Sequence, residues 1–552
     1  MKKILFLVFI IYSCSSNQTI VSNRAIHKLW HHKGLDLDSV PGISLEKWYA
    51  ENSSKKTKNE IIVAVLDTQI DLEHSDLQCQ IWVNQNEIAN NGVDDDRNGY
   101  LDDVNGWNFI GHKENGFLRY RNFESVRVVK KWSKYFEIND SLSTENQNAF
   151  KDYKRALINF QKENKYYKNW LKSIEYSVRI RTIVEDTLKH FFPKEDYSYD
   201  QLDSLYKIYK INDKTFKQRR DDNDTDLGAL IDNMLVCIQV GERKIEDLLE
   251  SKNQMDSLVN RNLNITYDDR KYIGDNPNEL EKGYGNNRLN ENHFQLAHNT
   301  AVSSIIASNR NNTVGAKGFH QHIKVMPLSI SAFGDEHDKD IAMAIYYAVD
   351  NGARIINMSF GKEFSLNQGW VSEAFKYAEK NNVLLVHGSG NSGFNVDENP
   401  YYPSDIDYLH DTKKELVSNF INVGSISKKI DSTLVSQFSS YGKQNVDLFA
   451  PGEEIYVAKP NNEYGYDSGT SLAAPQVSGT AALIWLYYPK LLVQEVKKII
   501  LESGVTIDKK VIKPGTQDEM VHFSELCKSG KILNTYNAMK MAEEMSKKKS
   551  RK

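Results

Sequence analysis

The chain has 552 residues, of which 40% are hydrophobic and 26% are charged, and its formal net charge is -4. This composition is typical of a soluble globular protein, and the length leaves room for several domains of roughly 100–200 residues each. The slightly acidic balance argues against a general nucleic-acid binder, so we expect no nucleic-acid partner.

The N-terminus predicts export. Residues 1–13 have the pattern of a signal peptide, with two lysines ahead of an apolar run that ends at Ile11. This run is far shorter than the ~20 residues that a spanning helix needs. Cys14 follows in a setting that resembles a bacterial lipobox, from which Tyr12 departs. We therefore expect a lipidated Cys14, a tether over 14–28 and a location in the cell envelope. The alternative is an ordinary cleaved signal with an incidental cysteine.

The other cysteines, Cys79, Cys237 and Cys527, lie far apart in the sequence. Lipidation of Cys14 would leave an odd number of thiols. We therefore expect neither a disulfide framework nor a cysteine metal site.

The first strong structural signal is a continuous apolar, β-branched run over 61–66. Such a run predicts a strand buried on both faces, as in a parallel sheet. It ends at Asp67, and the carboxyl end of a central strand is where α/β folds place their sites. The alternative for Asp67 is a turn residue without chemistry.

An Asp- and Asn-rich segment over 90–108 is a candidate calcium loop. Asp94, Asp96 and Asn98 place oxygens at alternate positions before a glycine, as in the first half of an EF-hand. The twelfth position is Asn105 instead of a bidentate glutamate. Structural calcium at Asp94, Asp96 and Asn98 is therefore one interpretation, and a hydrogen-bonded turn loop is the other.

Residues 111–290 are rich in Lys, Glu, Tyr and Asn, and apolar residues recur at helical spacing over 153–192 and 227–258. We expect a mainly α-helical insertion here, in which the aromatic stripes form core instead of a ligand site. Shielding of an active-site cleft and binding of a protein partner are both compatible with such an insertion.

After the insertion, polar residues follow further predicted elements. His298 opens a helix of small residues. A strand over 355–358 is followed by Ser359-Phe360-Gly361, and a buried strand over 383–388 leads to the glycine-flanked Asn391. Taken alone, His298 would be interpreted as a structural histidine and Asn391 as a turn residue.

Ser471 lies between Gly469 and a run of small residues that begins a buried helix. We expect Gly469 to allow a sharp turn and close approach of a ligand. Pro475 is expected in the first turn of the helix, where a missing N–H costs little. The backbone N–H of a serine at a helix N-terminus can hold an oxyanion. The alternative is a serine that only caps the helix.

These strings together resemble the motifs of the subtilisin-like serine proteases, the subtilases. Gly-Thr-Ser-Leu-Ala-Ala-Pro around Ser471 resembles their nucleophile signature, and Val-Ala-Val-Leu-Asp-Thr around Asp67 resembles their aspartate motif. The histidine motif around His298 departs more: Asn299 and Ala301 replace a glycine and a histidine of the family pattern, and Ser304 replaces its final glycine. In the aspartate motif, Gln69 replaces the usual glycine. The resemblance covers 29–110 and 291–545, which leaves a basic tail over 546–552.

The resemblance implies an α/β fold, a mostly parallel sheet flanked by helices, with the helical region inserted. It implies a serine endopeptidase that acts on peptides or proteins and requires no cofactor. Its implied site residues are the nucleophile Ser471, the base His298, the orienting Asp67, the oxyanion-hole Asn391 and the substrate-binding Ser359, Phe360 and Gly361. The stretch between Cys14 and the first strand is too short for the family's folding prodomain, so we do not expect activation by its removal.

One alternative is a catalytically impaired subtilase-fold lipoprotein of the envelope that acts as a binding scaffold. Gln69 and Asn299 motivate this alternative, because both depart from the family's motifs. Another alternative is an envelope lipoprotein whose main role is adhesion or assembly through the helical insertion.

Overall fold

The computed structural model describes residues 28–112, 116–138, 147–312, 314–408 and 414–550. The predicted signal over 1–13, Cys14 and nearly all of the tether lie outside the described residues. The chain divides into two compact units, one formed by Met1–Arg119 with Arg270–Lys552 and the other by Tyr120–Asp269.

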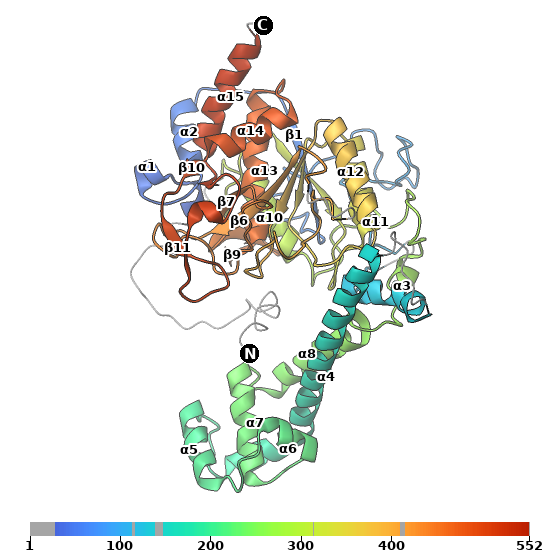
Figure 1. Cartoon of the computed structure of the whole chain (residues 1–552), viewed down its shortest axis with the longest axis vertical. Coiled ribbons are helices and arrows are strands. Elements are labelled where there is room, and N and C mark those ends of the chain that lie inside the picture. Colours follow the sequence, from blue (N-terminus) through green and yellow to red (C-terminus); the bar gives the residue numbers. More distant parts are fainter. Residues whose placement is uncertain (1–27, 113–115, 139–146, 313, 409–413, 551–552) are drawn as a thin grey trace. The chain divides into compact units, whose positions relative to one another are not determined.

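A nine-stranded sheet lies at the centre of the first unit, in the order β10-β13-β7-β6-β5-β4-β1-β3-β2 (Figure 1). All neighbouring strands run parallel except β10, which is antiparallel to β13. The strands of this sheet are β1 (Ile61–Asp67), β2 (Trp107–Asn108), β3 (Ile323–Ser329), β4 (Ile355–Met358), β5 (Leu384–Gly388), β6 (Phe420–Ile426), β7 (Leu448–Pro451), β10 (Val505–Thr506) and β13 (Lys531–Ile532). Two hairpins stand apart from it, β8 (Ile455–Lys459) with β9 (Glu463–Asp467) and β11 (Lys510–Ile512) with β12 (Met520–His522).

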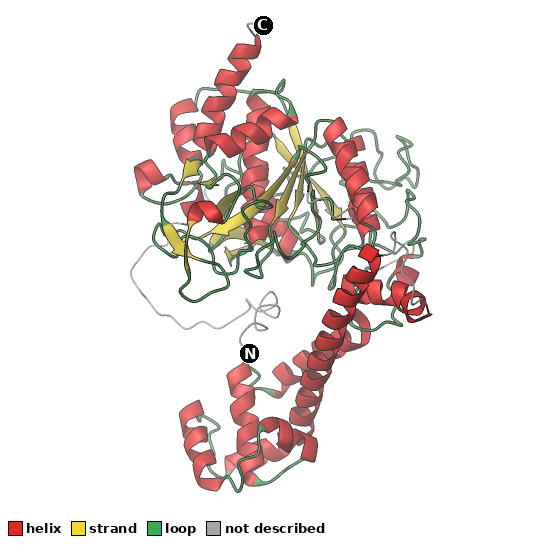
Figure 2. Ribbon diagram, viewed as in Figure 1, coloured by secondary structure: helices red, strands yellow, loops and turns green. Residues whose placement is uncertain are grey.

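Helices cover both faces of the sheet, as Figure 2 shows. Along β1, Val63 and Val65 pack into the core formed with α10 (Ala297–Ala307) and α13 (Thr470–Tyr487). The intervening Ala64 and Leu66 pack into the core formed with α11 (Asp338–Asp350) and α12 (Gln368–Lys380). The strand is therefore apolar throughout because successive side chains enter two different cores. This confirms the predicted α/β fold.

The remaining helices of this unit lie around the two cores. They are η1 (Trp30–His32), α1 (Leu35–Asp38), α2 (Leu45–Asn52), α9 (Arg270–Ile273), α14 (Val493–Ser503), η4 (Phe523–Glu525) and α15 (Thr535–Ser550). Residues 546–550, predicted as part of a basic tail, continue α15 and carry exposed lysines.

Helix α13 differs from expectation in one respect. It begins at Thr470, so Pro475 is its sixth residue, and the prediction that Pro475 occupies the first turn is wrong. A proline has no N–H to donate to the carbonyl four residues earlier, which is that of Ser471. The hydroxyl of Ser359 donates to this carbonyl instead, at 2.9 Å. The proline thus frees a helical acceptor that a neighbouring segment occupies.

The second unit is entirely helical in its described part, in agreement with the predicted helical insertion. Its longest helix, α4, has 43 residues, and its buried face contacts α7 and α8. The predicted helical stretch over 227–258 forms two helices, because Gly241 ends the first with a left-handed φ of 84°. The helices are α3 (Glu124–Ile138), α4 (Gln147–Lys189), α5 (Tyr199–Tyr209), α6 (Phe216–Asp222), α7 (Leu227–Val240), α8 (Ile245–Ser257) and the π-helical η3 (Leu258–Asn262).

The helical unit is shorter than the predicted insertion, since residues 111–119 and 270–290 belong to the first unit. The second of these stretches is tied to strand β2. Asn286 and Asn108 exchange backbone hydrogen bonds of 2.8 and 3.0 Å, and the Trp107 indole donates to the Tyr284 carbonyl. These tertiary bonds are not visible in the helical periodicity on which the boundary was predicted.

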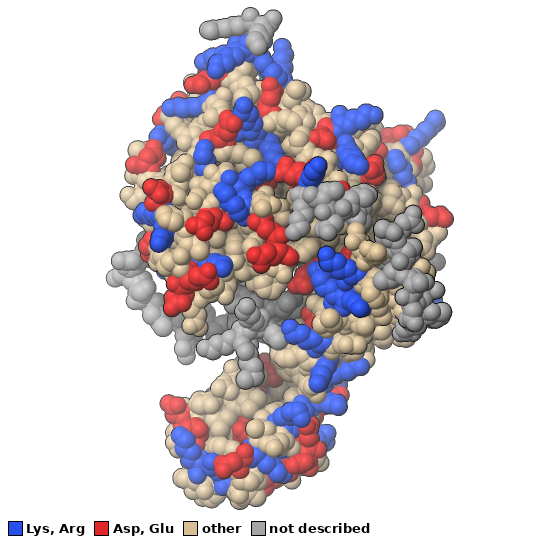
Figure 3. Space-filling model, viewed as in Figure 1, with Lys and Arg blue, Asp and Glu red and all other residues tan. Residues whose placement is uncertain are grey.

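The surface charges, the length and polarity of the helices, and the cysteines bear on the partners expected from the sequence. Figure 3 shows Lys and Arg interspersed with Asp and Glu on the visible face of the chain. Within the described ranges, no helix combines the length and apolar character needed to cross a bilayer. Cys79, Cys237 and Cys527 are free thiols.

Candidate active site

Asp67 and His298 meet at the carboxyl end of the sheet. Asp67 is the last residue of β1 and is 1% exposed, and His298 is the second residue of α10. The two side chains join through His298 Nδ1 and Asp67 Oδ1, which lie 2.7 Å apart. A carboxylate at this distance keeps the proton on Nδ1, so Nε2 is the nitrogen that can accept a proton. The imidazole remains 36% exposed and is therefore accessible.

The charge around His298 favours its protonated form. Burial lowers the pKa of His298, but the charge of Asp67 and the hydrogen bond to it raise the pKa by more. Asp467 adds a smaller raising effect, and Lys459 a small opposing one. The net pKa of His298 lies above its ordinary value of 6.5, so the imidazole becomes a neutral base only above that pH.

Ser471 is the second residue of α13, which packs beside α10. Its hydroxyl donates to the carbonyl of Ser359 at 2.9 Å, and the Ser359 hydroxyl donates back to the Ser471 carbonyl. Among the described residues, the Ser471 hydroxyl is bonded to this carbonyl and not to His298. Hydrogen bonds of this kind are often loose in a free enzyme and form when substrate binds.

Asn391 brings a second hydrogen-bond donor to the serine. Its Oδ1 accepts from the backbone N–H and the hydroxyl of Thr470, at 2.9 and 3.0 Å. This network assigns the orientation of the amide and turns Nδ2 away from Thr470. A Cβ placed on Gly469 would lie 3.5 Å from Asn391 Nδ2 and 3.6 Å from the Ser471 nitrogen. Both donors therefore border the same space, as an oxyanion site requires.

Gly469 borders the same space. Its φ of 166° is an extended conformation open to any residue. The chain turns directly after it, where the Leu472 N–H donates to the Gly469 carbonyl at 3.0 Å, so the predicted turn is present but does not depend on a glycine conformation. A Cβ at this position would meet its neighbours at ordinary contact distances, and the close approach of a ligand stays a prediction.

The segment Ser359-Phe360-Gly361 follows β4 directly and runs beside the serine. Its first residue makes the two bonds to Ser471 described above. The Phe360 carbonyl accepts from Nε2 of the buried His387 at 2.8 Å. Burial lowers the pKa of His387 to about 4, so the ring is neutral and serves as a structural donor. The segment is thus held on both sides and presents fixed backbone groups.

Two of the residues that depart from the family motifs, Gln69 and Asn299, join the aspartate and histidine elements. Gln69 Oε1 accepts from the backbone N–H groups of Glu291 and Asn292, at 2.8 and 2.7 Å. Asn299 Nδ2 donates to the Thr68 carbonyl at 2.8 Å. Both side chains therefore tie the end of β1 to the segment that carries His298. The sequence alone contains no signal for these contacts, nor for the role of Thr470 in orienting Asn391.

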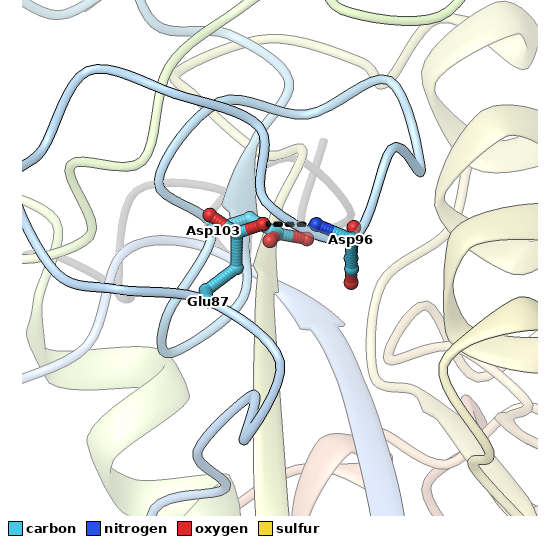
Figure 4. A group of neighbouring side chains, drawn as sticks. All are labelled: Glu87, Asp96 and Asp103. Carbon is cyan, nitrogen blue, oxygen red and sulfur yellow. Dashed lines mark hydrogen bonds between the residues drawn. The ribbon is translucent and has the colours of Figure 1, made fainter.

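Two carboxylates of the candidate calcium loop, Asp96 and Asp103, form a group with Glu87, which precedes the loop. Glu87, Asp96 and Asp103 each offer an oxygen, and these oxygens lie within 4.8 Å of one another (Figure 4). Asp94 is not in this group, because its two oxygens accept from the backbone N–H groups of Asn98 and Gly99. Asn98 directs its amide nitrogen at Asp96 and Asp103, at 3.2 and 2.9 Å.

The chemistry of this group suits a hard cation. Glu87 Oε1 accepts from two backbone N–H groups, whereas Oε2 is buried and has no partner among the described residues. Burial, with the neighbouring carboxylates, raises the pKa of Glu87 and of Asp103. A divalent cation with oxygen ligands would satisfy the unpaired oxygen and offset the repulsion.

Comparison with known proteins agrees with the motifs. A model of the subtilase family matches residues 58–524. The cell wall-associated protease of Bacillus subtilis (strain 168) is 31% identical over 237 residues, which cover 43% of this chain and 24% of that protein. The major intracellular serine protease of the same bacterium is 36% identical over 196 residues, covering 34% of this chain and 55% of that protein. The chain thus spans less than two thirds of either relative. Among solved structures, the protease domain of PatA is 26% identical, with a TM-score of 0.37 over 46% of this chain and 83% of that chain.

The electrostatics of His298 generate a pH prediction. A histidine NMR titration should give His298 a pKa above 6.5 in the wild type. In Asp67→Asn the raising charge is gone while burial remains, so the pKa should fall below 6.5. Asp467→Asn, the matched control, should produce a smaller decrease. A His298 pKa at or below 6.5 in the wild type, unchanged in Asp67→Asn, would contradict the conclusion that Asp67 raises this pKa.

Proposed function

The chain belongs to the subtilase family of serine proteases, and from this premise we propose that it is a serine endopeptidase that uses Ser471, His298 and Asp67. One observation carries the proposal. Asn391 Nδ2 and the Ser471 backbone N–H border one space beside the Ser471 Cβ, a site suited to a negatively charged oxygen. A helix-capping serine without chemistry would not need this second donor.

The proposed reaction is acyl transfer in two steps. His298 Nε2 takes the Ser471 hydroxyl proton as Oγ attacks the peptide carbonyl carbon, and the carbonyl becomes an oxyanion between Asn391 Nδ2 and the Ser471 N–H. The imidazolium then protonates the leaving amine, and the C–N bond breaks to leave an acyl-enzyme. Water, deprotonated by His298, hydrolyses the ester. Asp67 stabilises the imidazolium throughout and keeps its own charge.

The substrate is a peptide in extended conformation. Ser359-Phe360-Gly361 offers backbone groups beside the nucleophile, and its carbonyls are fixed from both sides. Main-chain hydrogen bonds to such a segment add a strand without requiring particular side chains. This supports a peptide or protein as the substrate in preference to a small ester.

The second candidate is the impaired scaffold that binds partners through the helical unit. The contacts of Gln69 and Asn299 count against it, because both residues reinforce the junction between the Asp67 and His298 elements. A binding scaffold has no need to keep the side chains of Asp67 and His298 in register.

Loss of catalytic groups should separate the two candidates. We expect Ser471→Ala to lower turnover by about 10⁶, as measured in a subtilisin, and Asn391→Ala by about 10²–10³. A fluorophosphonate probe should label the wild type and Asn391→Ala but not Ser471→Ala. Absence of wild-type labelling, with biological activity intact in Ser471→Ala, would favour the scaffold.

We propose a structural calcium ion held by Glu87, Asp96 and Asp103. Removing calcium with a chelator should lower the melting temperature. A calcium concentration of 100 times Kd raises the free energy of unfolding by about 2.7 kcal/mol, and the chelator removes this contribution. In Glu87→Gln the calcium dependence should disappear, whereas in Asp94→Asn, the matched control, it should persist. A wild-type melting temperature that is the same with and without calcium would contradict the proposed calcium site.

We also propose that the protein is exported and held at a membrane through lipid on Cys14, on the strength of the N-terminal pattern. Expressed in a bacterium with lipoprotein processing, the wild type should partition into the detergent phase of a Triton X-114 extract. Cys14→Ala should move to the aqueous phase, and Cys79→Ala, which alters an exposed free thiol, should not. Wild-type protein in the aqueous phase would refute the anchor.

A further inference from the structure

The ring of Tyr401 lies against two glycines of the candidate active site. A Cβ built on Gly361 would overlap the Tyr401 ring, and a Cβ built on Gly390 would lie 3.0 Å from its Cε1 and Cζ atoms. Gly361 ends the substrate-lining segment, and Gly390 directly precedes Asn391. The aromatic ring therefore occupies the space between these two parts of the site.

The position of Tyr401 is fixed by its neighbours. The next residue, Tyr402, exchanges two backbone hydrogen bonds of 2.8 Å with Lys362, which follows Gly361. The Tyr401 ring lies 5.9 Å from that of the buried His387, measured between centroids, and packs against a buried apolar cluster that includes Phe449. A half-buried ring held in this way is part of the wall of the site and not a mobile surface group.

The reaction geometry decides which part of a substrate would meet this ring. The scissile carbonyl carbon must reach Ser471 Oγ while its oxygen lies between the Ser471 N–H and Asn391 Nδ2. The side chain of the residue that carries this carbonyl is attached one bond away. Gly361 ends the segment proposed to pair with the peptide, and Gly390 directly precedes Asn391. The Tyr401 ring, which contacts both glycines, is therefore the group placed to meet this side chain.

We propose that Tyr401 fills the pocket for the substrate residue on the acyl side of the cleaved bond, and so restricts this enzyme to glycine, alanine and serine there. The inference rests on the proposed function and names its substrate class. A large side chain would have to displace an aromatic ring from a packed wall, which protein interiors resist because they are close-packed. The bare glycines at 361 and 390 make room for this ring instead of for substrate.

The test is digestion of a proteome-derived peptide library by the purified full chain. Wild type should cleave after glycine, alanine and serine. Tyr401→Ala should gain cleavage after phenylalanine and leucine, with kcat/KM for these substrates rising ten-fold or more relative to alanine, since pocket methylenes are worth about 10–200-fold each. Tyr401→Phe keeps the ring and should keep the wild-type preference.

Tyr441→Ala is the matched control, because Tyr441 packs against the same apolar cluster but is not among the groups nearest to a Cβ on Gly361 or Gly390. Its preference should match the wild type. Fluorophosphonate labelling of each protein reports an intact nucleophile. A labelled wild type that cleaves after phenylalanine or leucine as well as after alanine would overturn the pocket inference and leave the protease standing. A wild type that is neither labelled nor cleaves would overturn the proposed function, and the pocket inference with it.

Discussion

The hydrogen bond between Asp67 and His298 is the interaction on which the rest of the site depends. Its partners are 231 residues apart, with the whole helical unit between them, yet their atoms lie 2.7 Å apart. The parallel sheet makes this possible, because Asp67 ends a central strand and points to the face, shared with Val63 and Val65, that is covered by the helix carrying His298. A long insertion between two such elements costs little, since the closure entropy of a loop grows only slowly with its length.

Several side chains that stabilise the site break a local rule, either of helix formation or of the family's motifs. Pro475 leaves the Ser471 carbonyl without a helical donor, and the Ser359 hydroxyl takes that place. Gln69 and Asn299 replace glycines of the family pattern, and each fastens the Asp67 element to the His298 element. The departures therefore add hydrogen bonds where the catalytic residues must stay in register.

Local sequence patterns predicted the structure correctly where a single physical cause, such as burial, determines an element. The apolar run before Asp67 and the small-residue helix after Ser471 are both buried all round, so composition alone identified them. Expectations failed where several causes compete. The α13 helix starts early enough to put Pro475 in its second turn, because Ser359 compensates for the missing bond. The carboxylate group near the predicted calcium ligands is a separate case: calcium at Asp94, Asp96 and Asn98 stays a prediction, and the tertiary structure adds that Glu87 lies close to Asp96 and Asp103.

The sequence by itself determined the family, the α/β architecture, the helical character of the insertion and the identity of the residues that meet at the sheet edge. These follow from short-range patterns, since periodicity and motif strings are properties of neighbouring residues. Only the tertiary structure decided the limits of the helical unit, the partners of Gln69 and Asn299, and the position of Tyr401 between Gly361 and Gly390. Each of these depends on contacts between segments distant in the chain, and such contacts are set by packing, which no local pattern records.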